Sequence, residues 1–303
     1  MDYTRSGHGE FGVEKYLNYL FHDAKRVWDF FLYSSLFLAV AALGMAYISC
    51  MIQDIVFSPA IAAILAMVVF SVYNLNRKTD EAEDALNHAS RFKITNSYSR
   101  PLLYLAIAAY LAALCISAAH NATALAVTTI PLICGVLYSS PILPRSLGYS
   151  RLKEIPVVKN LVVSLAWGSA FALVPLSISR LGPNSSTFIA FFLIFCWTFI
   201  ASTLPDIRDK NGDAATGIVT IPVLMGVSRT RTFLTIFNAF SGIVIISLAK
   251  GILASRVVGL IILSLLYSEG CILIIHTTGN DDLLCDVISD GQFLAIGLAG
   301  LFF

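Results

Sequence analysis

Asn76, Asp80 and Asp84 have the residue types and the spacing of a divalent-cation site. They follow one another at intervals of four residues, directly after an uncharged apolar run. On a helix this interval stacks the three side chains along one stripe. Carboxylates four residues apart repel each other unless a cation lies between them, and hard cations such as Mg²⁺ prefer carboxylate oxygen and often bind phosphate as well. The stripe therefore indicates either a cation site or a solvated helix end of mixed charge.

A second acidic set, Asp206, Asp209 and Asp213, follows another apolar run about 130 residues later. The intervals of three and four residues place all three on one helix face, provided that the helix continues past the apolar run. Facing sets of carboxylates at one membrane surface would repel strongly. We therefore predict that both sets share one site that holds two or more Mg²⁺ ions together with a diphosphate.

The elements that must position these residues are membrane-spanning helices. The chain has 303 residues, of which 57% are hydrophobic and 13% are charged, against roughly 25% charged in ordinary soluble domains. Uncharged runs recur at roughly the 17–25 residues that cross a bilayer, and only helices satisfy the backbone there. We predict an all-α, polytopic membrane protein with nine transmembrane helices. The chain forms one domain, residues 1–303, whose first 25 residues are a polar N-terminal segment. The predicted spans are Phe31–Ile52, Val56–Tyr73, Pro101–Ala119, Ala122–Tyr138, Leu161–Ile178, Thr187–Leu204, Phe233–Ala249, Val257–Ile275 and Val287–Phe303.

The basic residues are distributed unevenly between the two sides of the predicted bundle. All but three of the 20 Lys and Arg residues lie in the N-terminal segment or in the long loops after the second, fourth and sixth spans. The exceptions are Arg180, Lys250 and Arg256. The positive-inside rule then places the N-terminus and the acidic loops in the cytoplasm. The net charge of +1 argues against a nucleic-acid partner, and no protein partner is evident.

A polar mouth above an apolar body suits a ligand with a diphosphate head and a hydrocarbon tail. Mg²⁺ and basic side chains would stabilise a leaving diphosphate and promote ionisation of an allylic C–O bond. The carbocation would need a water-poor apolar or aromatic pocket. The chain has 20 Phe, 12 Tyr and 3 Trp residues from which such a pocket could be built.

Both acidic sets resemble the two acidic motifs of the UbiA superfamily of intramembrane prenyltransferases. Tyr149-x-x-x-Lys153 is similar to the motif that this family carries between its fourth and fifth helices. Nine helices with motif-bearing cytoplasmic loops after helices 2, 4 and 6 also match, so the resemblance covers almost the whole chain. It implies a bundle similar to the isoprenyl diphosphate synthases, and Mg²⁺-dependent transfer of a prenyl group from a prenyl diphosphate to a lipophilic acceptor in the bilayer.

The resemblance also implies roles for particular residues. It gives the metal and diphosphate site to Asn76, Asp80, Asp84, Asp206, Asp209 and Asp213. Tyr149 and Lys153 carry over as groups beside the diphosphate or the reacting end. Further candidates for substrate binding are Arg26, which lacks the proline that usually follows it in the family, Arg91, Lys93 and Tyr138. For Arg91 and Lys93 the alternative is a pure topology signal.

The acceptor stays open on sequence grounds. The run from Asp206 to Pro222 looks most like the archaeal members that make digeranylgeranylglyceryl phosphate, but the loop after the first motif lacks their Arg-Pro-x-x-x-Gly pattern. A polyprenyl glycerol phosphate and an aromatic quinone precursor are both compatible. Outside prenyl transfer, the alternatives are a membrane transporter, a CDP-alcohol phosphotransferase and a structural membrane protein. The phosphotransferase signature is missing, and a transporter would carry its polar residues at the bilayer midplane.

Glu269 is a lone carboxylate inside the eighth predicted span. Such residues usually face a bundle interior or a water-filled cavity, because an unpaired charge in lipid is unfavourable. We expect it about two turns from the acidic face, in the cavity wall. It could orient the acceptor or take its proton, or it could hydrogen-bond a neighbouring helix in a packing role.

Overall fold

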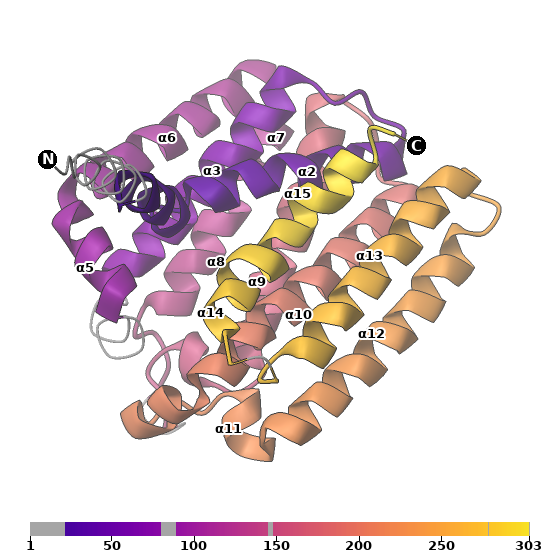
Figure 1. Ribbon diagram of the computed structural model, residues 1–303. Helices are drawn as coiled ribbons and strands as arrows, with labels where there is room; N and C mark the ends of the chain where they lie inside the picture. Colours follow the sequence, from indigo (N-terminus) through magenta and orange to yellow (C-terminus); the bar gives the residue numbers. More distant parts are fainter. Residues whose placement is uncertain (1–21, 80–88, 145–147, 278, 303) are drawn as a thin grey trace, which may run out of the picture.

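The computed structural model describes residues 22–79, 89–144, 148–277 and 279–302, and every regular element among them is helical. These helices form a bundle in which segments far apart in the sequence lie against one another (Figure 1). The elements are α2 Leu36–Gln53, α3 Pro59–Thr79, α5 Ala89–Ser97, α6 Ser99–His120, α7 Ala122–Thr128, α8 Ile130–Ser139, η2 Leu152–Glu154, α9 Val158–Ile178, α10 Ser185–Thr216, α11 Ile221–Met225, α12 Val227–Ala249, α13 Ser255–Ile274, α14 Asp281–Leu283, η3 Leu284–Ser289 and α15 Asp290–Ala299.

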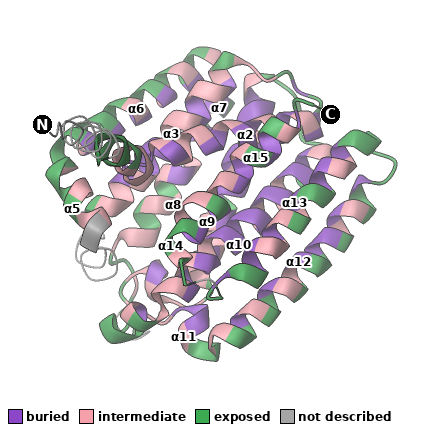
Figure 2. Ribbon diagram, in the orientation of Figure 1, coloured by how far each residue is buried: buried purple, intermediate pink, exposed green. Residues whose placement is uncertain are grey.

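Within the described ranges, eight helical segments are long and apolar enough to cross a membrane, with α7 and α8 counted together. Large apolar side chains such as Tyr104, Ile236 and Phe240 face outward on them, while buried residues gather toward the middle of the bundle (Figure 2). This pattern fits a helical protein surrounded by lipid. The predicted all-α membrane fold is confirmed.

The predicted count of nine spans is not confirmed. The ninth, Val287–Phe303, overlaps the end of η3 and α15; together with α14 these two elements form a composite that we call the last helix. The middle piece is a single π-helical turn, so no one of the three helices reaches spanning length. π-turns are rare and often occur at functional sites.

The first predicted span, Phe31–Ile52, is wrong at its beginning. Residues 22–33 form a separate helix, the chain turns at Ser34 and Ser35, and α2 starts at Leu36. Ser35 has a φ of 66°, in the left-handed region. A break in a helix leaves carbonyls without their usual donors, and α3 supplies two. The Asn74 amide donates to the Ser34 carbonyl at 3.0 Å, and the Arg77 guanidinium donates to the Tyr33 carbonyl.

Helix α10 is the central element of the bundle, since it packs against α2, α9, α12 and α13. It begins at an Asn184 cap, whose side-chain oxygen accepts from the Thr187 N–H at 3.0 Å, and ends at Gly217, which has a φ of 76°. The helix therefore runs three turns past the predicted end at Leu204. Asp206, Asp209 and Asp213 therefore lie on one continuous helix, as their prediction on a common helix face required.

The last helix approaches α2 closely at a pair of glycines. A Cβ on Gly44 would lie 2.2 Å from the Phe293 carbonyl oxygen, and a Cβ on Gly297 would lie 2.3 Å from the Gly44 Cα. Small residues allow helix backbones to approach in a membrane, where van der Waals packing replaces much of the hydrophobic driving force.

We predict that Gly44→Ala destabilises the protein, because the new methyl group meets backbone atoms that no side-chain rotation can move. Overpacking of this kind costs about 1–3 kcal/mol or more. Gly259→Ala in α13 is the matched control, since a Cβ there has no other atom within 4 Å and alanine favours a helix. In a thermal unfolding experiment in detergent, Gly44→Ala should lower the midpoint and Gly259→Ala should not. Equal midpoints for both variants would show that α2 and α15 do not approach so closely.

Candidate functional site

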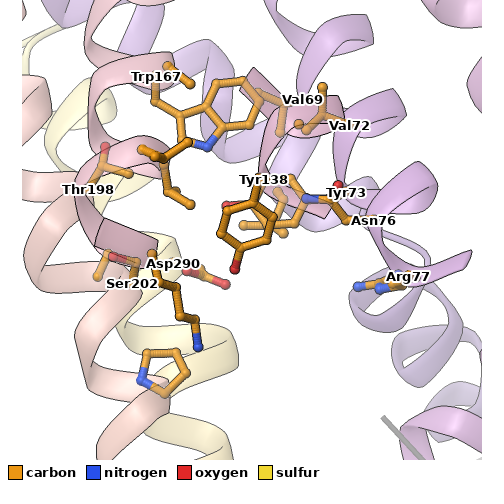
Figure 3. Close-up of a pocket in the computed structure, with 18 of the residues that line it drawn as sticks. Val69, Val72, Tyr73, Asn76, Arg77, Tyr138, Trp167, Thr198, Ser202 and Asp290 are labelled. Carbon is orange, nitrogen blue, oxygen red and sulfur yellow. The ribbon is translucent and has the colours of Figure 1, made fainter. Parts of the chain in front are cut away.

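A cavity of about 370 Å³ lies at the end of the bundle that carries the acidic residues. Its walls come from α2, α3, α8, α9, α10 and the last helix, with Arg91 and Lys153 reaching it from shorter elements. One part of the lining is polar or charged, with Asn76, Arg77 and Asp206 among its residues, whereas the other part is apolar and aromatic. Figure 3 shows this change of character, with Trp167, Val69 and Val72 on one side of Tyr138, and Asp290 and Arg77 on the other.

Of the first acidic set, only Asn76 can be placed. It lies in the last turn of α3 and lines the cavity. Asp80 and Asp84 lie outside the described residues. Gly135 of α8 lies beside this amide, because a Cβ at Gly135 would be 3.8 Å from the Asn76 Oδ1, an ordinary van der Waals contact.

All three members of the second set, Asp206, Asp209 and Asp213, line the same cavity from α10. Asp206 is only 3% exposed. Its carboxylate accepts from the Lys159 Nζ at 2.5 Å and from the Asn160 Nδ2 at 3.1 Å, both in the first turn of α9. A buried carboxylate is tolerated when it is paired and hydrogen-bonded in this way. The pair therefore fixes α9 against α10 at the mouth of the cavity.

Arg208 connects α10 to the last helix. Its guanidinium donates to both oxygens of Asp209, with the Nε to Oδ1 distance at 2.9 Å, and to the Asp286 Oδ1 at 2.9 Å and the Asp282 Oδ1 at 3.2 Å. A guanidinium is suited to several carboxylates at once because its donors are fixed in a plane. Arg208 thereby brings the acidic start of the last helix into the site.

Lys153 is held by the short turn η2 and is 6% exposed. The turn is stabilised by Glu154, whose carboxylate accepts from the Arg151 Nε at 2.7 Å and from the Ser150 N–H at 2.7 Å. Burial raises the pKa of the Glu154 carboxyl, but these hydrogen bonds outweigh it and lower the pKa to about 2. The carboxylate therefore stabilises the turn that carries Lys153.

The other residues predicted from the sequence divide into two groups. Arg91 and Tyr138 line the cavity. Arg26 and Lys93 are exposed and Tyr149 is partly exposed, and none of these three belongs to the cavity lining. Their roles in substrate binding remain predictions.

Aromatic side chains form the wall below the charged groups. Tyr73 stacks on Trp167 with ring centroids 5.8 Å apart and planes 4° apart, and Trp167 contacts Phe171 at 6.2 Å. The negative faces of such rings attract cations. This part of the cavity can therefore hold an apolar chain and stabilise a positive charge beside it.

Six charged residues of the lining were missed by sequence reasoning, namely Arg77, Glu154, Lys159, Arg208, Asp286 and Asp290. For two of the acids, Asp286 and Asp290, a signal was present. Asp282, Asp286 and Asp290 recur every four residues, as the first acidic set does. The cationic residues carried no such signal, because their roles depend on which helices pack together.

The oxygen donors of the cavity suit a hard divalent cation. Asn76 from α3 faces the same space as Asp206 and Asp213 from α10. Within the described ranges, no three His, Cys, Asp or Glu side chains are close enough to hold a metal by themselves. Asp80 and Asp84, outside those ranges, are the expected additional ligands.

Glu269 does not line the cavity, contrary to the expectation from its position in the eighth span. Its carboxylate accepts from the Thr235 Oγ1 at 2.7 Å and from the Asn238 Nδ2 at 3.0 Å. Both partners belong to α12, so the contact joins α12 to α13. These contacts favour the packing role over a role in chemistry.

Comparison with known proteins agrees with this arrangement. A model of the UbiA prenyltransferase family matches residues 35–281. Two curated relatives are named digeranylgeranylglyceryl phosphate synthase. The one from Natronomonas pharaonis is 26% identical over 63% of this chain and 67% of its own, and the one from Methanopyrus kandleri is 27% identical over 58% of this chain and 63% of its own. The match thus spans less than two thirds of the second relative.

Solved structures of UbiA homologues share the fold. A homologue from Archaeoglobus fulgidus, bound to GPP and Mg²⁺, superposes with a TM-score of 0.64 at 19% identity over 91% of this chain and 100% of its own. A homologue from Aeropyrum pernix K1 superposes with a TM-score of 0.65 at 18% identity over 87% of this chain and 96% of its own. At these identities the likeness establishes the fold.

We predict that Glu269→Gln leaves enzymatic turnover with saturating acceptor unchanged, because the amide keeps the shape of the side chain at a place outside the cavity. Glu269→Leu should lower the thermal unfolding midpoint, since Asn238 and Thr235 lose their acceptor inside the bundle. A large fall in turnover for Glu269→Gln, in a protein that unfolds at the normal temperature, would instead assign Glu269 to the chemistry.

Proposed function

Because the chain belongs to the UbiA prenyltransferase family, we propose that it transfers a prenyl group from a prenyl diphosphate to a lipophilic acceptor in the membrane, with Mg²⁺ as cofactor. One observation carries the proposal. Asn76 of the first motif, the three aspartates of the second motif and several cations line one cavity whose deeper wall is apolar and aromatic. That lining matches a substrate with a charged head and a hydrocarbon tail.

The metal site is proposed to consist of Asn76, Asp80, Asp84, Asp206 and Asp213, with Asp209 at its edge. Bound Mg²⁺ would neutralise the diphosphate and so stabilise it as a leaving group. Asn76 of α3 and the carboxylates of α10 would hold the head group from two sides, since both helices line one cavity. The A. fulgidus structures with GPP or DMAPP and Mg²⁺ support this assignment by analogy of fold.

The cations of the cavity would bind the diphosphate directly. Arg77, Arg91 and Lys153 lie in the lining from three different elements. Charge-assisted hydrogen bonds from such groups are strong and strengthen further as negative charge develops on the leaving group. These side chains therefore promote heterolysis of the allylic C–O bond.

The aromatic wall would protect the allylic carbocation. Trp167, stacked on Tyr73, lies beside the apolar part of the cavity. Its ring face stabilises a positive charge, and the surrounding apolar residues limit the water that would quench it.

The acceptor is proposed to be a polyprenyl glycerol phosphate, whose hydroxyl oxygen would form the new C–O bond. The names of both curated relatives support this choice. Aromatic quinone precursors are the competing class, and a direct assay separates the two. The N-terminus and the active-site loops are proposed to face the cytoplasm, as the basic residues favour.

The central test uses a radiolabelled geranylgeranyl diphosphate donor and a panel of glycerol phosphate and phenolic acceptors. Purified protein should release diphosphate and form prenylated product only when Mg²⁺ is present, and a chelator should abolish both. Asp80→Ala, Asp84→Ala, Asp206→Ala and Asp213→Ala should each reduce the rate by about two orders of magnitude or more, because each removes a ligand or a positioning charge. Near-normal turnover in any two folded variants would contradict a shared site.

Arg91 and Lys93 provide a matched pair for the basic groups. Both lie on α5, but only Arg91 lines the cavity, whereas Lys93 is exposed. Arg91→Ala should raise the donor KM about tenfold or more, as expected for loss of a charge-assisted contact. Lys93→Ala should leave the donor KM unchanged. If neither substitution alters it, both residues serve only as topology signals.

A further inference from the structure

The last helix carries a cavity carboxylate that neither acidic motif includes. Asp290 is the first residue of α15, directly after the π-turn η3, and it lines the cavity. Figure 3 shows its side chain directed into the space around Tyr138. We infer that Asp290 is a catalytic residue that takes the proton of the acceptor hydroxyl. This inference rests on the proposed prenyl transfer.

Asp290 lies at the boundary between the two parts of the cavity. One turn toward the mouth is Asp286, which accepts from Arg208. One turn deeper is Phe293, which lines the cavity and packs on Trp197 with ring centroids 5.9 Å apart. In a prenyl diphosphate the reacting carbon joins the charged head to the apolar tail. It must therefore lie near the same boundary, within reach of this carboxylate.

Three other carboxylates of the cavity are already held by cations. Asp206 pairs with Lys159, and Asp209 and Asp286 pair with Arg208. Among the residues that the structure describes, no hydrogen bond or ion pair to Asp290 is found. Charged residues of the same lining that act on it at longer range include Asp286, Arg208, Arg91 and Arg77. Asp290 is thus a carboxylate in the cavity that no contact among the described residues occupies.

The proposed step balances without any further reactant. The allylic C–O bond breaks and its electron pair leaves with the diphosphate. A lone pair of the acceptor oxygen forms the new C–O bond to the allylic carbon. The O–H bond of the acceptor then breaks, its electron pair stays on the ether oxygen, and its proton moves to the Asp290 carboxylate, which returns it to solvent through the mouth. Proton transfer to a motif carboxylate would instead weaken its hold on a cation.

The test compares Asp290→Asn with Asp281→Asn, a matched acid-to-amide change on the same segment whose residue does not line the cavity. The donor is geranylgeranyl diphosphate with Mg²⁺, and the acceptor is a polyprenyl glycerol phosphate. Asp290→Asn should lower kcat for transfer by about 10²–10⁴, while donor affinity, measured by thermal shift, stays within about twofold. Asp281→Asn should keep both values.

A chemical rescue separates proton transfer from a structural role. In Asp290→Ala, added formate should restore at least about a tenth of the lost rate, because a small carboxylate can take the same proton. Slow Mg²⁺-dependent release of diphosphate without acceptor should persist in both Asp290 variants.

Four results would overturn the inference. Two concern Asp290→Asn, namely transfer within about threefold of the wild-type rate or loss of donor binding. The other two are a rate of Asp290→Ala that formate does not raise, and transfer by the wild-type protein to phenols alone. Absence of any prenyl transfer by the wild-type protein would refute the proposed function itself.

Discussion

The ion pair between Lys159 and the buried Asp206 is the contact on which the polar end of this bundle depends. Most of the chain is apolar, and a carboxylate as buried as Asp206 is tolerated only with donors close by. Lys159 and Asn160 supply them from the first turn of α9. The same contact brings α9 and α10 together where the aromatic wall of α9 begins. One contact thus neutralises a buried charge at the mouth and also positions the helix whose aromatic residues line the cavity below.

Arg208 compensates acidic charge in the same way where α10 meets the last helix. Without it, the acids Asp209, Asp282 and Asp286 would repel one another at the end of the bundle. With it, the π-turn and the start of α15 are fastened beside α10, and Asp290 enters the cavity. The acidic residues of α10 and of the last helix thus meet at one end of the bundle, which is the layout expected of an enzyme that binds a diphosphate at the edge of an apolar cavity.

Sequence reasoning captured what depends on local periodicity. The intervals between Asp206, Asp209 and Asp213 predicted one helical face, and α10 continues through them. It failed where contacts between distant segments decide the outcome. The break at Ser34 and Ser35 lies within an apolar run and is stabilised by Asn74 and Arg77 of another helix. Glu269 was placed in the cavity wall, but its partners on α12 lie elsewhere. Asp290 could have been found by the four-residue recurrence that singled out Asn76.

The close contact between Gly44 and Gly297 has a consequence for the polar site. It sets the separation of α2 and the last helix at a point seven residues, or roughly 10 Å, along the helix from Asp290. A helix is stiff over that length. The small size of Gly44 and Gly297 therefore determines how far the Asp290 carboxylate reaches into the cavity. Substitutions at Gly44 or Gly297 would therefore shift Asp290 relative to the cavity without changing any residue proposed to contact the substrate.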